Sequence, residues 1–109
     1  MPYNQELADR IQDRIGSMPG ITAKKMFGGI GFLLNGNMAC GVHGQNLIVR
    51  VPPERTAEML AQPHTKPFDL TGKPMKGWIL VEAEGYAAAN DLDSWIQLGV
   101  EYAGSLPAK

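Results

Sequence analysis

Apolar residues recur at helical spacing near the start of the chain. Leu7, Ile11 and Ile15 lie four residues apart, and charged residues occupy many of the positions between them. This pattern predicts an amphipathic helix over about residues 3–17, with its apolar stripe buried against the rest of the protein. The Pro-Gly pair at residues 19–20 ends this helix, because proline cannot donate into the helical ladder and glycine accepts the left-handed exit.

A second helical pattern closes the chain, and a weaker one lies in its middle. Asn90 is a suitable N-cap residue, and the apolar residues after it are three or four positions apart, which predicts a helix over about residues 91–105. Pro52 and Pro53 stop a preceding strand and preset a helix start. We therefore expect a short helix over about residues 53–61.

Between these helices, short apolar runs alternate with turns rich in glycine and asparagine. Four runs predict strands: Lys24–Gly28, Ile30–Leu34, Met38–Val42 and Leu47–Val51. Residues 35–37 and 43–46 supply the positive φ angles of tight hairpins, so these strands form a meander. Further along, residues 62–67 read as a loop, Phe68–Leu70 as an edge segment and Trp78–Val81 as a strand.

The fourth strand shows which side of the sheet is covered. Leu47, Val49 and Val51 alternate with Ile48 and Arg50, so the first three face a core and the other two lie on the opposite face. The order of elements contains no strand–helix–strand alternation. The sequence therefore predicts an α+β, two-layer fold: an antiparallel β-sheet meander with the N-terminal, short middle and C-terminal helices packed on one face.

Composition narrows the class of protein. A length of 109 residues predicts a single domain over residues 1–109. The chain carries 10 Lys+Arg against 11 Asp+Glu, and this formal net charge of -1 excludes a strongly basic module. A single cysteine excludes an intramolecular disulfide and a four-cysteine zinc site. No apolar run is long enough to span a bilayer and the polar start lacks a signal-peptide core, so we expect a cytoplasmic protein with no membrane contact.

Several residues invite a chemical interpretation. The Gly-Gly-Ile-Gly run at residues 28–31 resembles a phosphate-binding loop, but a strand follows it rather than a helix, which favours a bulge or close backbone packing. Cys40 and His43 lie three apart, so in a strand they point to opposite faces. We interpret Cys40 as a small buried hydrophobe and His64 as an exposed loop residue, rather than as a catalytic pair.

Charge is unevenly distributed along the chain. Residues 24–76 carry seven basic and three acidic side chains, whereas residues 77–109 carry five acidic and one basic. The candidate interaction surface consists of Lys24, Lys25, Arg50, Lys73 and Lys76. If these residues share a face they would attract phosphates, and solvated scatter is the alternative. Complementary basic and acidic patches would equally guide a protein contact, including a homodimer.

Three large aromatic residues, Phe68, Trp78 and Trp95, could line a ligand pocket. In a domain of this size such residues are more often part of the core. We therefore assign Trp95 to the interface between the closing helix and the sheet.

The chain resembles the TfoX/Sxy N-terminal domain, in its short single-domain form, over nearly its whole length. The most specific part of the resemblance is the motif of Met26, Phe27, Gly28, Gly29 and Gly31. The other matching segments are the turn at 35–37, Leu47–Val51, Pro67–Asp69, Lys73–Trp78 and Leu92–Trp95. The resemblance implies a compact bacterial α+β domain. Its longer relatives are competence regulators that act as transcription co-activators with a cyclic-AMP receptor protein, and they carry a C-terminal helical domain that this sequence lacks.

The resemblance brings no catalytic, metal or cofactor residues with it. We therefore expect a non-enzymatic regulatory or protein-interaction module that needs no cofactor, with the transcription machinery as the partner that the resemblance implies. Direct nucleic-acid binding stays open. The alternative is a small ligand-binding domain or enzyme that uses the glycine-rich strand junction.

Overall fold

The computed structural model describes residues 3–26, 28–68 and 76–108. Its helical segments are α1 (Gln5–Ile15), the 3-10 turn η1 (Pro53–Arg55), α2 (Thr56–Leu60), α3 (Ala83–Tyr86) and α4 (Ala89–Ser105). Its strands are β1 (Ile21–Met26), β2 (Gly29–Leu34), β3 (Asn37–His43), β4 (Asn46–Arg50), β5 (Thr65–Pro67) and β6 (Trp78–Val81).

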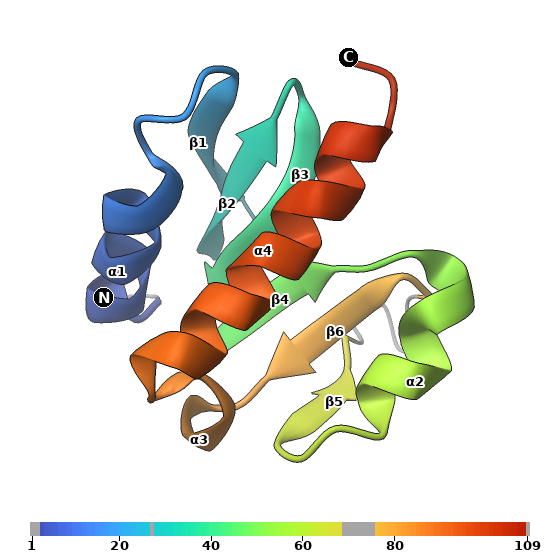
Figure 1. The fold of residues 1–109 in the computed structure, drawn as a ribbon. Helices are drawn as coiled ribbons and strands as arrows, with labels where there is room; N and C mark the ends of the chain where they lie inside the picture. The colour runs from blue at the N-terminus through green and yellow to red at the C-terminus, as the bar shows by residue number, and fades with distance from the viewer. Residues whose placement is uncertain (1–2, 27, 69–75, 109) are drawn as a thin grey trace.

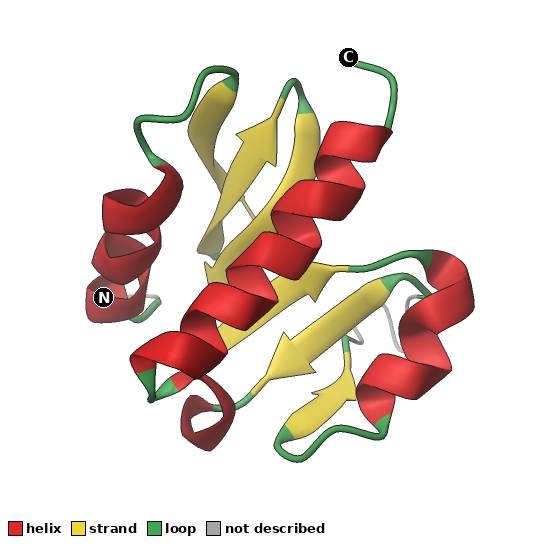
Figure 2. Ribbon diagram, in the orientation of Figure 1, coloured by secondary structure: helices red, strands yellow, loops and turns green. Residues whose placement is uncertain are grey.

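The strands of the described residues form one antiparallel sheet with the order β1-β2-β3-β4-β6-β5. The predicted meander is β1 to β4, and β6 then pairs with β4 and carries β5 at the outer edge. Figure 1 shows α1 and α4 lying in front of the open sheet and α2 beside the β5–β6 end, and Figure 2 shows the same two layers by element type. The predicted α+β class and the placement of the three helices are confirmed.

The main core lies between the sheet and the helices. The strand register aligns Phe32, Cys40, Val49 and Ile79 in one row and Val42, Leu47 and Val81 in the next, and all seven are buried. Their helical partners in the same cluster are Leu7 and Ile11 of α1 and Leu92 and Ile96 of α4. Burial of this apolar surface holds the helices on the sheet, as the helical spacing of their apolar residues requires.

The opposite face of the sheet is not simply exposed. Ile48 lies on the face opposite Leu47 and Val49, yet it is only 2% exposed. Phe68 is also buried, and its ring contacts the rings of His43 and Trp78 at centroid distances of 5.8 and 6.3 Å. Alternation along a strand shows which face a residue takes but not whether that face carries apolar neighbours.

The backbone of helix α4 lies very close to the backbone of strand β3 where the helix crosses the sheet. Leu92, Ile96, Gly99 and Ala103 are its buried residues, at spacings of four, three and four. A Cβ atom at Gly99 would lie 2.2 Å from the carbonyl oxygen of Ala39 in β3. Only a residue without a side chain lets the helix backbone approach the strand this closely.

Several predicted boundaries need correction. The edge strand is β5, residues 65–67, inside the stretch expected to be a loop, because proline disfavours a central strand but is accepted at an edge. Residues 69–70 of the predicted edge segment lie outside the described residues. The first strand begins at residue 21 rather than 24 and ends at 26.

The predicted start of the last helix is also wrong. The N-cap is Ala88, which makes no side-chain cap bond, while the Asn90 carbonyl already accepts a hydrogen bond from Ser94 Oγ at 3.0 Å. The reason is α3, a single turn that the sequence pattern did not reveal. Its Tyr86 hydroxyl donates to the Gln45 carbonyl at 2.5 Å, so the chain is anchored just before α4 begins.

None of the helices in the described part of the chain combines the length and the apolar character needed to cross a membrane.

Candidate functional site

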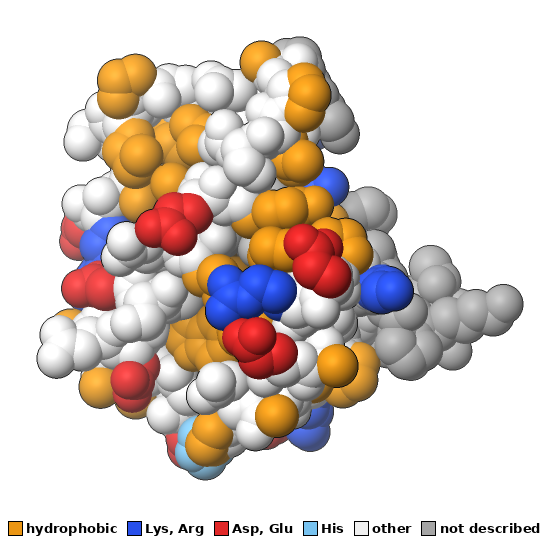
Figure 3. All heavy atoms as spheres, turned by 45° about the vertical axis from the view of Figure 1, so that its right-hand side comes forward, with side chains coloured by type: hydrophobic (Ala, Val, Ile, Leu, Met, Phe, Trp, Pro, Cys, Tyr) orange, Lys and Arg blue, Asp and Glu red, His pale blue; other side chains and the backbone are white. Residues whose placement is uncertain are grey.

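A groove runs between α4 and the turn that follows α2. Asp91, Ser94, Trp95 and Leu98 lie on one side of α4, and two hollows of about 250 and 280 Å³ adjoin along it. Gln62, Asp91 and Trp95 line both hollows; Met59, Ser94 and Leu98 complete the first, and Pro63, His64, Glu84 and Gly85 complete the second. We call these ten residues the α2–α4 groove. On this side of the molecule, apolar side chains are exposed among acidic and basic ones (Figure 3).

The floor of the groove is continuous with the main core. Met59 is buried, and Trp95 and Leu98 are partly buried and pack against the core cluster. Trp95 thus packs on the core, but its predicted place in the interface between the closing helix and the sheet is wrong, because its side chain is only partly buried. Its neighbour Ile96 occupies the helix–sheet interface, so Trp95 supports the groove from below and remains accessible from above.

The rim of the groove carries two carboxylates that lie outside the ion pairs of the described residues. Asp91 and Glu84 are exposed carboxylates. In residues 3–26, 28–68 and 76–108 the ion pairs are Arg14–Asp93, Arg55–Glu58 and Lys66–Glu82, and neither rim carboxylate takes part in one. The groove thus combines an aromatic floor with an anionic edge.

The far wall of the groove is a tightly built turn. His64 adopts a φ of 64°, a left-handed conformation that costs a residue with a side chain about 1–2 kcal/mol. Its carbonyl accepts a hydrogen bond from Glu82 N at 2.8 Å, and Thr65 Oγ1 donates to the Gln62 carbonyl at 2.8 Å. The exposure predicted for His64 is confirmed, whereas its backbone conformation and its place in a groove had no signal in the sequence.

Gly85 explains why α3 can lie so close to this turn. A Cβ atom at Gly85 would lie 2.7 Å from Val81 Cγ1 and 3.1 Å from His64 Cβ. Real Cβ atoms essentially never come within 3.0 Å of a heavy atom outside their own residue and its chain neighbours. A glycine is thus part of the wall that sets the width of the groove.

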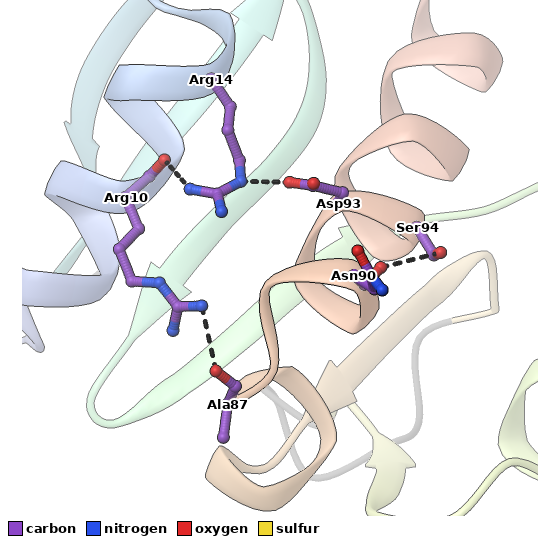
Figure 4. Close-up of polar contacts among 6 residues, drawn as sticks. All are labelled: Arg10, Arg14, Ala87, Asn90, Asp93 and Ser94. Atoms are coloured by element: carbon purple, nitrogen blue, oxygen red, sulfur yellow. Dashed lines mark hydrogen bonds and ion pairs between the residues drawn. The ribbon is translucent and has the colours of Figure 1, made fainter.

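The other side of α4 is tied to α1 rather than open. Arg14 forms an ion pair with Asp93 through its Nε atom, and Arg10 Nη2 donates to the Ala87 carbonyl at 3.1 Å (Figure 4). Arg14 Nη1 also donates to the Arg10 carbonyl at 2.9 Å, which holds the two arginines together on α1. The two sides of α4 therefore differ: polar bonds bridge it to α1, and hollows separate it from the α2 turn.

The cysteine and histidine residues do not form a reactive pair. Cys40 is fully buried in the core between Phe32 and Val49, and burial raises the pKa of its thiol from 9.0 to about 12. His43 lies on the opposite face of β3 against Phe68. Across the described residues no three His, Cys, Asp or Glu side chains are grouped closely enough to hold a metal ion.

The glycine motif has a packing role. Gly28 has a φ of +75°, and a Cβ atom at Gly29 would lie 2.0 Å from the Val42 carbonyl oxygen. Gly31 pairs with Gly41 in the register. Met26 closes β1, and Phe27 lies outside the described residues. The motif therefore lets β2 approach β3 and β1 turn into β2, as close backbone packing predicts.

Among the described residues, the basic side chains singled out from the sequence do not gather on one face. Lys24 and Lys25 are exposed neighbours on the edge strand β1, so they point to opposite faces of the sheet. Arg50 lies three strands away, about 14 Å at usual strand spacing, with its guanidinium carbon 5.4 Å from the Trp78 ring centroid and 5.6 Å from that of Tyr102.

Lys76 lies near Arg50, because the residues that follow them in the chain are hydrogen-bonded: Val51 N donates to the Gly77 carbonyl at 2.9 Å. Lys73 lies outside the described residues. The described members of the candidate surface therefore occupy two separate places.

These features define a small α+β domain with an open antiparallel sheet and an amphipathic groove in its helical layer. The family model of the TfoX N-terminal domain matches residues 13–103, and the chain belongs to this family. A crystal structure of a protein from Pseudomonas syringae has the same fold, with a TM-score of 0.65 and 16% identity over 92% of this chain and 97% of that one. No curated protein sequence matches the chain.

Proposed function

We propose that this domain is a non-enzymatic regulatory module that binds another protein, and that the partner docks in the α2–α4 groove. One observation carries the proposal: an accessible aromatic floor, continuous with the core, beside exposed carboxylates that lack an ion-pair partner among the described residues. Interaction sites in proteins combine an apolar centre with a polar rim in this way.

The shape of the groove supports a protein partner. It consists of two hollows of about 250 and 280 Å³ that adjoin along α4. Two small hollows in a row suit two side chains of one polypeptide segment. The chain's single cysteine, Cys40, is buried in β3 and does not line the groove.

The regulatory part of the proposal rests on membership of the TfoX N-terminal domain family. By resemblance to the longer competence regulators, the partner is a component of the transcription machinery, and the domain works in the cytoplasm. The separation of Lys24 and Lys25 from Arg50 and Lys76 speaks for a protein contact over direct DNA contact, which needs a continuous basic face.

Site-specific photocrosslinking tests the proposal in living bacterial cells. The photoreactive residue p-benzoylphenylalanine replaces Ser94, which is exposed on the groove. The matched control carries it at Asp13, exposed on α1. We expect an adduct of defined mass from the Ser94 position and none from Asp13, with mass spectrometry identifying a transcription protein. No adduct from Ser94, or the same adducts from both positions, would contradict the proposal.

A further inference from the structure

We infer that the α2–α4 groove recognises a specific pair of partner side chains, an arginine beside an apolar residue. The inference rests on the proposed function, because it names the chemistry of the protein segment that would dock there. The two hollows differ in the residues that line only one of them. The first, which we call the apolar hollow, has Met59 and Leu98 beside Ser94, and the second, which we call the polar hollow, has Glu84 and His64 beside Pro63 and Gly85. Trp95 and Asp91 line both.

The polar hollow has the elements that bind a guanidinium group. Asp91 and Trp95 are four residues apart on α4, so their Cβ atoms lie about 6 Å apart and their side chains adjoin. Glu84 of α3 borders the same hollow. A guanidinium can stack on the indole and donate to a carboxylate at the same time, because it is planar and carries donors around its edge. Lysine, with a compact and strongly hydrated charge, uses such a site less well.

The protein already contains one internal arrangement of this kind. The guanidinium of Arg50 lies 5.4 Å from the centroid of Trp78 and 5.6 Å from that of Tyr102. Trp95 is the other tryptophan of the chain, and the described residues that line the groove with it include two carboxylates and no arginine. Charge complementarity therefore selects a cationic side chain as the missing occupant.

The apolar hollow defines the neighbour of that arginine. It adjoins the polar hollow along the axis of α4, so a partner helix would present its two anchor residues three or four positions apart. Binding of both anchors buries the exposed part of Trp95, which makes its indole N–H a direct reporter.

A peptide titration of the ¹⁵N-labelled full chain tests the inference. The probe is an acetylated and amidated alanine-rich peptide with leucine four residues from arginine, and its control has neutral citrulline in place of arginine. We expect the Trp95 indole signal to shift and that of Trp78 to stay, with citrulline weakening binding about tenfold. No Trp95 shift at about 1 mM peptide, or equal binding of the citrulline peptide, would overturn the inference.

Variants separate this inference from the proposed function. Glu84→Gln with Asp91→Asn removes both rim carboxylates at exposed positions, and Asp13→Asn is the control for altered net charge. We expect the double variant to lose about tenfold in peptide affinity and most of the Ser94 photocrosslink, with Asp13→Asn unchanged. If the double variant keeps the crosslink, the groove still binds a partner but recognition of arginine is refuted.

Discussion

The close approach of α4 to β3 at Gly99 provides the sharpest test of how this helix packs on the sheet. Replacing Gly99 by alanine puts a methyl group where the Ala39 carbonyl oxygen lies 2.2 Å away. That oxygen belongs to the backbone of a central strand and cannot rotate aside as a side chain would. Helix α4 must therefore move away from β3 by about 1 Å to restore ordinary contact.

The cost of this movement outweighs the gain from a better helix former. Forcing an extra methyl group into a close-packed interface costs about 1–3 kcal/mol. A gap of about 1 Å also removes a quarter to a half of the dispersion attraction at Leu92 and Ile96, which α4 buries on the sheet. Alanine in place of glycine returns about 1 kcal/mol through helix propensity. We expect Gly99→Ala to destabilise the domain by about 2 kcal/mol, or about 8 °C in Tm.

Gly104 is the matched control in the same helix. A Cβ atom there would lie 3.3 Å from Leu34 Cδ2, the mobile end of a side chain. We therefore expect Gly104→Ala to raise the free energy of unfolding by less than about 0.5 kcal/mol. Urea unfolding followed by far-UV circular dichroism measures both variants. Equal stability of Gly99→Ala and Gly104→Ala would refute the contact between α4 and Ala39.

Three further measurements test other parts of the structure. Burial raises the pKa of the Cys40 thiol from 9.0 to about 12, so the folded state holds the thiol proton more tightly than the unfolded state does. The contribution of the buried thiol to the free energy of unfolding is therefore fully present below pH 9 and is lost as pH rises toward 12. Between pH 8 and about 10.5, wild type should lose about 2 kcal/mol more than Cys40→Ala in urea unfolding, and parallel pH profiles would contradict this burial. Tyr86→Phe removes the hydrogen bond to the Gln45 carbonyl and should cost about 1 kcal/mol in the same assay; a cost near zero would mean that the bond does not anchor α3. A double-mutant cycle with Arg14→Met and Asp93→Asn should give a coupling energy below about 1 kcal/mol, because the pair is solvent-accessible, and a value above about 2 kcal/mol would contradict this description of the pair.

The sequence predicted the parts of this protein that depend on one element at a time. The spacing of Leu7, Ile11 and Ile15 located α1, and the burial of Cys40 followed from its place in an apolar strand. Glycine and asparagine marked the turn after β2, where Asn35 and Gly36 indeed have positive φ angles. Each of these features has a local signal, because periodicity and turn chemistry act over a few neighbouring residues.

Tertiary structure alone decided the candidate site. His64 and Trp95 meet across a groove only because β5 and β6 pair at the sheet edge and α4 packs on β3 through Gly99, two contacts between distant parts of the chain. Ile48, on the face of the sheet opposite α4, is also buried, although alternation along its strand contained no sign of what covers that face. A pattern along one element states which residues share a face. What covers that face depends on how the whole core closes, and no local pattern contains that information.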